Sequence, residues 1–160
     1  MKTPIQTTLA ASAFAIAASL IQGCSSPKAL QNALEPHAIV LNDYEAARSA
    51  AAAEGRLLLV NSTGHSAGNA RIMEVRTFQD PLVAEALTQF VEARLYSDAA
   101  DPIAREANLR VIDEVVRGRA VPAYVALHPT TGKELGRCNG ARFDAAEFAR
   151  FLNEAAALPH

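Results

Sequence analysis

The chain has 160 residues, of which 17 are acidic and 15 are basic, so its formal net charge at pH 7 is −2. No window of the sequence is strongly basic, which excludes the electrostatic footprint of a protein that binds nucleic acid. The length is that of one globular domain, with a core large enough to fold without disulfides or a structural metal.

The first 23 residues have the organisation of an export signal. Lys2 supplies a positive start, and Leu9–Ile21 is an apolar run too short to span a bilayer as a stable helix. The run ends in Ile21-Gln22-Gly23-Cys24, which resembles a bacterial lipoprotein signal. That resemblance implies that cleavage leaves Cys24 as the first mature residue and that Cys24 carries several acyl chains. An ordinary signal peptide followed by a chance cysteine, or a short membrane anchor, are the alternatives.

Residues 24–37 are small and polar, with prolines near both ends, and predict a flexible tether; residues 38–160 form the predicted domain. Two acyl chains suffice for stable anchoring, at roughly 0.8 kcal/mol per buried methylene. We therefore expect an exported lipoprotein that faces the periplasm and whose mature chain has no transmembrane helix. Ser25 after the lipid-bearing cysteine favours the outer membrane over the inner one, by the sorting pattern of enteric bacteria.

Capping and turn residues divide the rest of the chain into alternating helices and strands. Aspartates at N-cap positions, two of them followed by proline, predict helix starts. The predicted helices are 43–54, 67–76, one beginning at Asp80-Pro81, 101–117 ended by Gly118, and one opened by Asp144. The predicted strands are a short one near 38–41, then 56–62, 90–96, 120–127 and 133–138.

The strand at 90–96 alternates apolar and polar residues, which predicts one covered face. The turn at 129–132 predicts that the last two strands form a hairpin. This order of elements fits an α/β fold with a central mixed sheet and helices on both faces.

The most informative stretch is LLLVNSTGHSAGNARIMEVRTFQDP, residues 57–81. It resembles the thioredoxin-like domain of periplasmic thiol:disulfide interchange proteins, whose pattern is a strand, T-G, an aromatic residue, C-x-N-C-R, x-M-E, an aromatic residue and x-D-P. The matching positions are Thr63-Gly64, Asn69, Arg71, Met73-Glu74, Phe78 and Asp80-Pro81. Ala67 and Ala70 stand where the pattern has cysteines. An alanine methyl group cannot form a thiolate, so the segment Ala67-Gly68-Asn69-Ala70 is expected to be a degenerate redox site.

The resemblance also implies a cis-proline loop at Val121-Pro122, which would face the start of the 67–76 helix. X-Pro bonds are the only peptide bonds that adopt the cis form at low cost. A proline that begins an edge strand is the alternative for Pro122. Asp98 matches an acidic position of the family, but without the cysteines we expect it to be a solvated loop carboxylate.

Other reactive side chains carry weaker signals. His65 occupies the aromatic position of the pattern, and we interpret it as a solvated loop residue. Adjacent residues rarely aim their side chains at each other, so His65 and Ser66 are not expected to form a nucleophile–base pair. The histidines show no metal-ligand spacing, and we expect neither a metal nor another cofactor. With Cys24 acylated, Cys138 has no partner for an intramolecular disulfide; it is either a small buried apolar residue or an exposed thiol that forms mixed disulfides with an envelope partner.

These observations predict a lipid-anchored, redox-inactive protein of the cell envelope. The groove between the Ala67–Ala70 helix start and the Pro122 loop would bind an envelope protein or an extended peptide. A thiol:disulfide oxidoreductase acting through Cys138, or together with a redox partner, is the rival hypothesis. A domain that serves only as a structural spacer is the third.

Overall fold

The computed structural model describes residues 37–159. The predicted signal, Cys24 and all of the predicted tether except His37 lie outside this range. The strands are β1 (Ala38–Leu41), β2 (Leu57–Thr63), β3 (Phe90–Tyr96), β4 (Ala123–Leu127) and β5 (Glu134–Asn139). The helices are α2 (Tyr44–Glu54), α3 (Gly68–Ile72), η1 (Met73–Thr77), α4 (Pro81–Leu87), α5 (Pro102–Val111), η2 (Ile112–Val116) and α6 (Ala145–Ala157).

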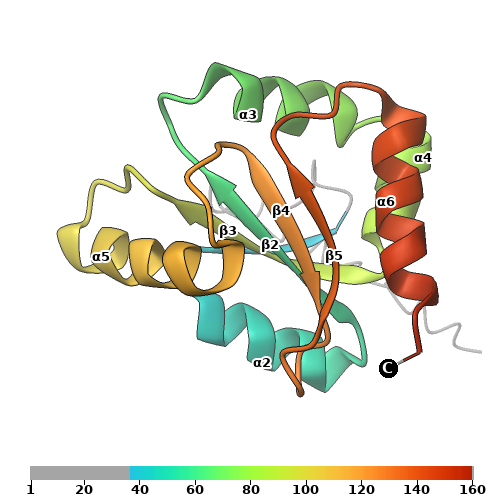
Figure 1. Ribbon diagram of the computed structural model, residues 1–160, viewed down its shortest axis with the longest axis horizontal. Coiled ribbons are helices and arrows are strands. Elements are labelled where there is room, and N and C mark those ends of the chain that lie inside the picture. The colour runs from blue at the N-terminus through green and yellow to red at the C-terminus, as the bar shows by residue number, and fades with distance from the viewer. Residues whose placement is uncertain (1–36, 160) are drawn as a thin grey trace, which may run out of the picture.

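The strands form one mixed sheet in the order β1-β3-β2-β4-β5 (Figure 1). Strands β1, β2 and β3 are mutually parallel, whereas β4 runs antiparallel to both β2 and β5. Helix α2 and η2 pack on one face of the sheet, and η1, α4 and α6 pack on the other. The predicted mixed sheet with helices on both faces is therefore confirmed.

Local capping signals fix the helix starts. The side chains of Asp43, Asp80, Asp101 and Asp144 each accept a hydrogen bond from a backbone N–H in the first turn of α2, α4, α5 and α6. Such caps satisfy donors that a helix leaves unpaired at its start. Gly55 ends α2 with a left-handed φ of 64°, which glycine adopts without a Cβ clash. These helix boundaries were predictable from short-range sequence signals.

Two helices differ from their predicted form because their last turns are π-helical. The predicted helix 67–76 is α3 followed by the π-helical η1, and α5 likewise continues into η2. A π turn admits an extra residue and shifts the faces of the helix that follow it. The left-handed residue that ends η2 is Arg117, with a φ of 54°, rather than Gly118. Strand β4 begins at Ala123, three residues later than predicted.

The prediction of one covered face for β3 is wrong. All seven of its residues are buried, including Glu92 and Arg94. Strand β3 lies between β1 and β2, and helices cover the sheet on both sides. The polar positions of the alternation therefore point into the protein rather than into water.

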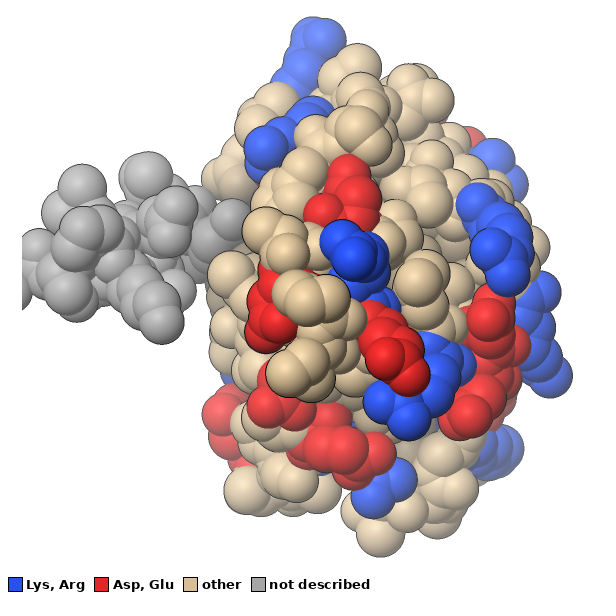
Figure 2. All heavy atoms as spheres, turned by 90° about the vertical axis from the view of Figure 1, so that its left-hand side faces the viewer, with Lys and Arg blue, Asp and Glu red and all other residues tan. Residues whose placement is uncertain are grey.

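Charged side chains of both signs are interspersed on the face that carries α5 (Figure 2). The charged residues of the 102–114 segment are exposed, as a solvated face requires: Arg105, Glu106, Arg110, Asp113 and Glu114. Within residues 37–159, no helix is both long and apolar enough to cross a membrane.

Candidate functional site

Three loops meet at the end of the sheet where β2 stops and β4 starts (Figure 1). Ser62 pairs with Ala123 across the antiparallel β2–β4 ladder, so the loop after Thr63 and the loop before Ala123 emerge at the same end. The Val121-Pro122 bond in the second loop is cis. Gly140 N–H donates to the carbonyl of Pro122 over 2.9 Å, which brings the loop after β5 beside the other two.

Helix α3 begins in the first of these loops. Ala67 is its N-cap residue, with an extended backbone and no side-chain cap. Gly68 and Asn69 are exposed, Ala67 is half-buried, and Ala70 is buried with 1% exposure. The start of α3 thus presents a small, mostly backbone surface to solvent. Neither alanine supplies an ionisable or nucleophilic atom.

Asp98 fixes the loop that leads into α3. Its carboxylate accepts the backbone N–H of His65 (2.7 Å), the backbone N–H of Ser66 (3.0 Å) and the hydroxyl of Ser66 (2.9 Å). The hydrogen bond from the His65 backbone contributes most to lowering the pKa of Asp98 to about 2. Asp98 is a loop carboxylate near the surface, but one that also orders the loop, a role that was not predicted from the sequence.

His65 does not act on Ser66 in this arrangement. The imidazole stacks on Tyr96, with ring centroids 4.0 Å apart and an interplanar angle of 14°. The Ser66 hydroxyl instead donates to Asp98. The two adjacent side chains thus have separate partners, and the geometry supports no nucleophile–base pair. His65 is exposed and forms an aromatic surface beside the start of α3.

A buried ionic cluster lies on the sheet face that α3 and η1 cover. Arg94 holds Glu92 in a bidentate pair, with Nε–Oε1 of 2.7 Å and Nη2–Oε2 of 3.0 Å. The Asn61 amide donates to Glu92 Oε1 over 2.7 Å, and His37 Nε2 lies 2.6 Å from Glu92 Oε2. Burial alone raises the pKa of Glu92, but Arg94 and His37 outweigh that effect and hold the pKa well below its usual value.

Glu74 connects this cluster to the helix that carries Ala70. Its Oε1 accepts the Thr63 hydroxyl over 3.1 Å, and its Oε2 lies 4.0 Å from Arg94 and 3.7 Å from Arg71. Arg71, whose side chain is exposed, is the member of this group of charged residues that lies at the surface. A hydrogen bond to Thr63 and a longer ion pair with Arg94 thus tie η1 to the ends of β2 and β3.

Sequence reasoning missed the cluster, although one signal was present. Glu92 and Arg94 are charged residues two positions apart inside an otherwise apolar strand. His37, which we had assigned to the end of the tether, is buried and hydrogen-bonded across 55 positions to Glu92.

The solved structures that resemble this fold are thioredoxins and related redox proteins. A thioredoxin from Thermus thermophilus shares 27% sequence identity with a TM-score of 0.60, covering 75% of this chain and 88% of the thioredoxin. A putative disulphide-isomerase from Bacteroides thetaiotaomicron gives 19% identity and a TM-score of 0.60, over 77% of this chain and 95% of its own. The chain has a thioredoxin-like fold.

A DsbH oxidoreductase gives 16% identity and a TM-score of 0.58, over 76% of this chain and 87% of its own. No protein-family model matches the sequence, and a search of curated proteins finds no match. The thioredoxin-like fold predicted from residues 57–81 is thus confirmed by structural similarity that extends over the domain.

Cys138 is the one cysteine among the described residues of the thioredoxin-like domain, and it is a buried free thiol. It is 5% exposed and lies opposite Tyr124 in the β4–β5 ladder. Burial raises the pKa of its thiol, and nearby Arg142 only partly opposes this effect. A raised thiol pKa leaves little thiolate at neutral pH, so the environment does not activate Cys138 as a nucleophile.

The described part of the thioredoxin-like domain offers no metal centre. Among residues 37–159, no three His, Cys, Asp or Glu side chains are placed to share an ion. The chemistry available at the junction of the three loops is therefore that of backbone groups, small side chains and the aromatic surface of His65.

Proposed function

We propose that the protein is a lipid-anchored component of the bacterial envelope whose thioredoxin-like domain binds an extended segment of a partner protein without thiol chemistry. The observation that carries this proposal is the meeting of three loops, at Ala67–Ala70, Val121-Pro122 and Gly140, whose described residues carry no thiol. We call the surface between these loops the groove. In this proposal Ala67 and Ala70 occupy the places of a lost dithiol.

The absence of thiols from the groove argues for binding rather than electron transfer. Disulfide exchange requires an attacking thiolate and a second thiol to resolve the mixed disulfide. Ala67 and Ala70 provide neither, and the buried Cys138 has a raised pKa. Fold alone does not determine activity, since one fold hosts many functions.

Two features of the groove favour an extended peptide as the ligand. Gly68 and Asn69 are exposed and Val121 is half-buried, so the surface is open and low in profile. The loop at Ala67 is also pre-organised, because Asp98 accepts three hydrogen bonds from it. A fixed backbone surface beside strand ends suits recognition of another backbone, as in strand addition.

The cellular location belongs to the same proposal. The lipoprotein signal ending in Cys24 and the polar segment that follows support acylation and display of the domain in the periplasm, with the outer membrane favoured. Intact-mass analysis of protein extracted from membranes should find a chain that begins at Cys24 with lipid attached. A soluble protein that retains residues 1–23 would contradict the anchoring.

A groove-blocking variant tests the binding role. In Gly68→Arg the new side chain enters open space, since no atom lies within 4 Å of the Cβ position. Ala53→Arg is the matched control, because it also adds an arginine at an exposed helix position, on α2. Affinity capture from envelope extracts should lose the partner with Gly68→Arg and keep it with Ala53→Arg. Equal capture by both variants would contradict the groove.

The rival oxidoreductase hypothesis has its own readout. The full chain should reduce a disulfide substrate with dithiothreitol only at the background rate, because the groove contains no thiol. Turnover that disappears in Cys138→Ser, or partner capture that reductant abolishes, would favour the rival.

A further inference from the structure

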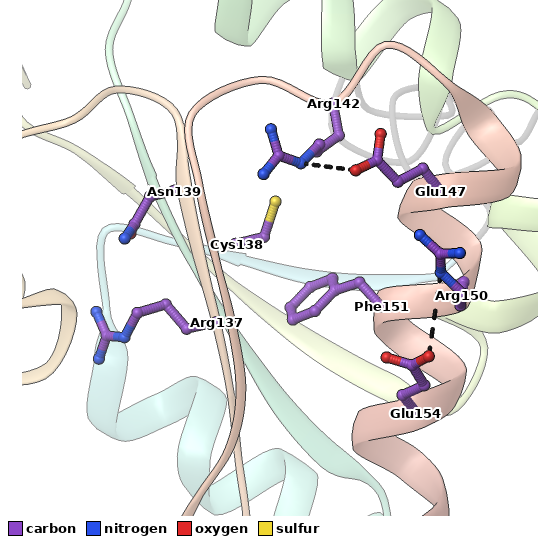
Figure 3. Close-up of a pocket in the computed structure, with 8 residues that line it drawn as sticks. All are labelled: Arg137, Cys138, Asn139, Arg142, Glu147, Arg150, Phe151 and Glu154. Carbon is purple, nitrogen blue, oxygen red and sulfur yellow. Dashed lines mark ion pairs between the residues drawn. The ribbon is translucent and has the colours of Figure 1, made fainter.

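A pocket of about 400 Å³ opens between β5 and α6, beside the groove (Figure 3). Its lining includes three arginines (Arg137, Arg142 and Arg150) and two carboxylates, Glu147 and Glu154, while Glu134 outside the lining pairs with Arg137. The side chains of Cys138 and Phe151 also line it. The pocket therefore combines guanidinium groups at the rim with a weakly polar interior.

The rim arginines hold their carboxylate partners loosely. Arg142 Nε lies 3.2 Å from Glu147 Oε1, and Arg150 Nε lies 4.0 Å from Glu154 Oε1. Both pairs are exposed, with 45% of the Arg142 side chain and 68% of the Arg150 side chain accessible. Exposed pairs of this kind are weak, so a ligand carboxylate can compete with them.

In both pairs Nε is the guanidinium atom recorded nearest the carboxylate, so each exposed guanidinium has terminal N–H groups that can donate to a second acceptor. Arg137 is different, because its guanidinium donates to the carbonyls of Val115 and Val116 and to Glu134. We therefore assign ligand contacts to Arg142 and Arg150, and a structural role to Arg137.

The interior of the pocket suits a short carbon stem. In Figure 3 the sulfur of Cys138 points towards the guanidinium of Arg142, and the ring of Phe151 projects from α6 towards β5. Cys138 makes only a weak contact to the Gly140 carbonyl, at 3.8 Å. A carboxylate on a flexible apolar stem could pair with guanidinium nitrogens while its methylenes lie against sulfur and ring.

The pocket adjoins the loop after β5 that contacts Pro122. Asn139, which lines the pocket, pairs with Ala123, the residue after Pro122. Gly140 contacts Pro122 directly, and Arg142 follows two residues later. Two residues of extended chain span about 7 Å, so a peptide that lies against the loop at Gly140 is within a few residues of Arg142.

We propose that this pocket binds the carboxylate of an acidic side chain carried by the extended peptide that occupies the groove. This proposal rests on the proposed function, which supplies the bound peptide. It adds that the partner segment carries Glu or Asp a few residues from its contact with the loop at Val121-Pro122. Arg142 and Arg150 determine this preference.

The reactivity of Cys138 can be used to test the pocket in the absence of a partner protein. Its alkylation in the full chain can be measured by mass spectrometry of the tryptic peptide Cys138–Arg142, using iodoacetate as an anionic reagent and iodoacetamide as a neutral one. In Arg142→Gln or Arg150→Gln, trypsin still leaves a peptide that contains Cys138. Each variant should lower the iodoacetate-to-iodoacetamide rate ratio by about two- to fivefold, the worth of one exposed charge.

The matched control is Arg48→Gln on α2, because Arg48 is 43% exposed and pairs with Glu45 at 3.3 Å. This variant should leave the ratio unchanged. An iodoacetate-to-iodoacetamide rate ratio that is the same in the wild type, Arg142→Gln, Arg150→Gln and Arg48→Gln would overturn the role of these arginines in the pocket.

Peptide protection tests the ligand. A synthetic peptide of alternating Ala and Glu should slow iodoacetamide alkylation of Cys138, and an Ala–Gln peptide of equal length should not. Arg142→Gln should abolish this protection. Equal protection by both peptides would overturn the acidic preference and leave the groove intact. Equal protection by free glutarate would make the ligand a small acid instead of a peptide.

The Gly68→Arg variant separates the two proposals. If the acidic peptide still protects Cys138 in that variant, the pocket binds carboxylates without a peptide in the groove. In that case the proposed binding of a peptide in the groove is wrong, while the carboxylate preference of the pocket stands. If protection is lost with Gly68→Arg and with Arg142→Gln but not with Ala53→Arg, both proposals are supported.

Discussion

On one face of the sheet, β3 contributes Val91, Ala93 and Leu95 to an apolar cluster beneath α2 and η2. On the other face, its intervening residues include Glu92 and Arg94, which are buried to a similar degree. The apolar side chains are stabilised by removal from water, whatever their exact neighbours. The charged pair is stable only with each partner in place, because an unpaired buried charge is costly. The charged face is the one that supports the groove.

The largest expected effect comes from breaking the buried pair. Glu92→Gln keeps the size of the side chain but leaves Arg94 without its bidentate carboxylate. Removing one partner of a buried ion pair costs about 3–5 kcal/mol. Urea unfolding of the full chain should show a loss of that size. If Glu92→Gln lowered the free energy of unfolding by less than Val91→Ala does, the two faces of the sheet would not differ in this way.

The apolar face should respond less strongly at the adjacent position. Val91 is 0% exposed, and Val91→Ala deletes two buried methyl groups and leaves a small cavity. We expect the free energy of unfolding to fall by about 1.5–3 kcal/mol. Val91→Ile adds one methylene group to a packed face and should cost about 1–3 kcal/mol, less than Glu92→Gln. The same urea titration measures all three variants.

Asp98 gives a smaller effect with a defined pH dependence. Asp98→Asn weakens three hydrogen bonds to the loop at Ser66 and should cost about 1–2 kcal/mol at neutral pH, because the site is partly solvated. Its folded-state pKa of about 2 lies below the unfolded value, so its contribution is complete above about pH 4 and disappears as the pH falls towards 2. The difference between wild type and variant should therefore shrink over that interval. A difference that stays constant from pH 5 to pH 2 would contradict this role.

The smallest expected effect is at the pocket. Arg142→Gln removes one exposed ion pair with Glu147 and should change the free energy of unfolding by less than about 0.5 kcal/mol. A much larger change in unfolding would show that Arg142 supports the fold. The alkylation ratio at Cys138 would then no longer report on ligand preference alone.

The sequence predicted the features that depend on short-range signals. The caps at Asp43, Asp80, Asp101 and Asp144 are each recognisable from a few neighbouring residues, and the helices begin where these aspartates predicted. The pattern in residues 57–81 was sufficient to predict the thioredoxin-like fold. It could not reveal the π-helical turns, which depend on how η1 and η2 pack against the sheet.

The features that sequence reasoning missed depend on contacts between distant residues. Glu92 meets Asn61 across 31 positions and His37 across 55, and Asp98 meets His65 across 33. A local window sees Glu92 and Arg94 only as polar residues in an alternating strand and places them in water. The acylation of Cys24 and the envelope location remain predictions, because residues 1–36 are outside the described range.

The bidentate contact between Glu92 and Arg94 also limits how this sequence can change over generations. Replacing both residues by apolar ones is compatible with a stable interior, whereas either replacement alone passes through an intermediate that is weaker by about 3–5 kcal/mol. A domain with a total stability of about 5–15 kcal/mol rarely survives such a step. The two positions should therefore be inherited together. Drift should accumulate first at exposed positions outside the groove, such as Ala53 on α2, and descendants that bind different partners should still carry the same buried pair.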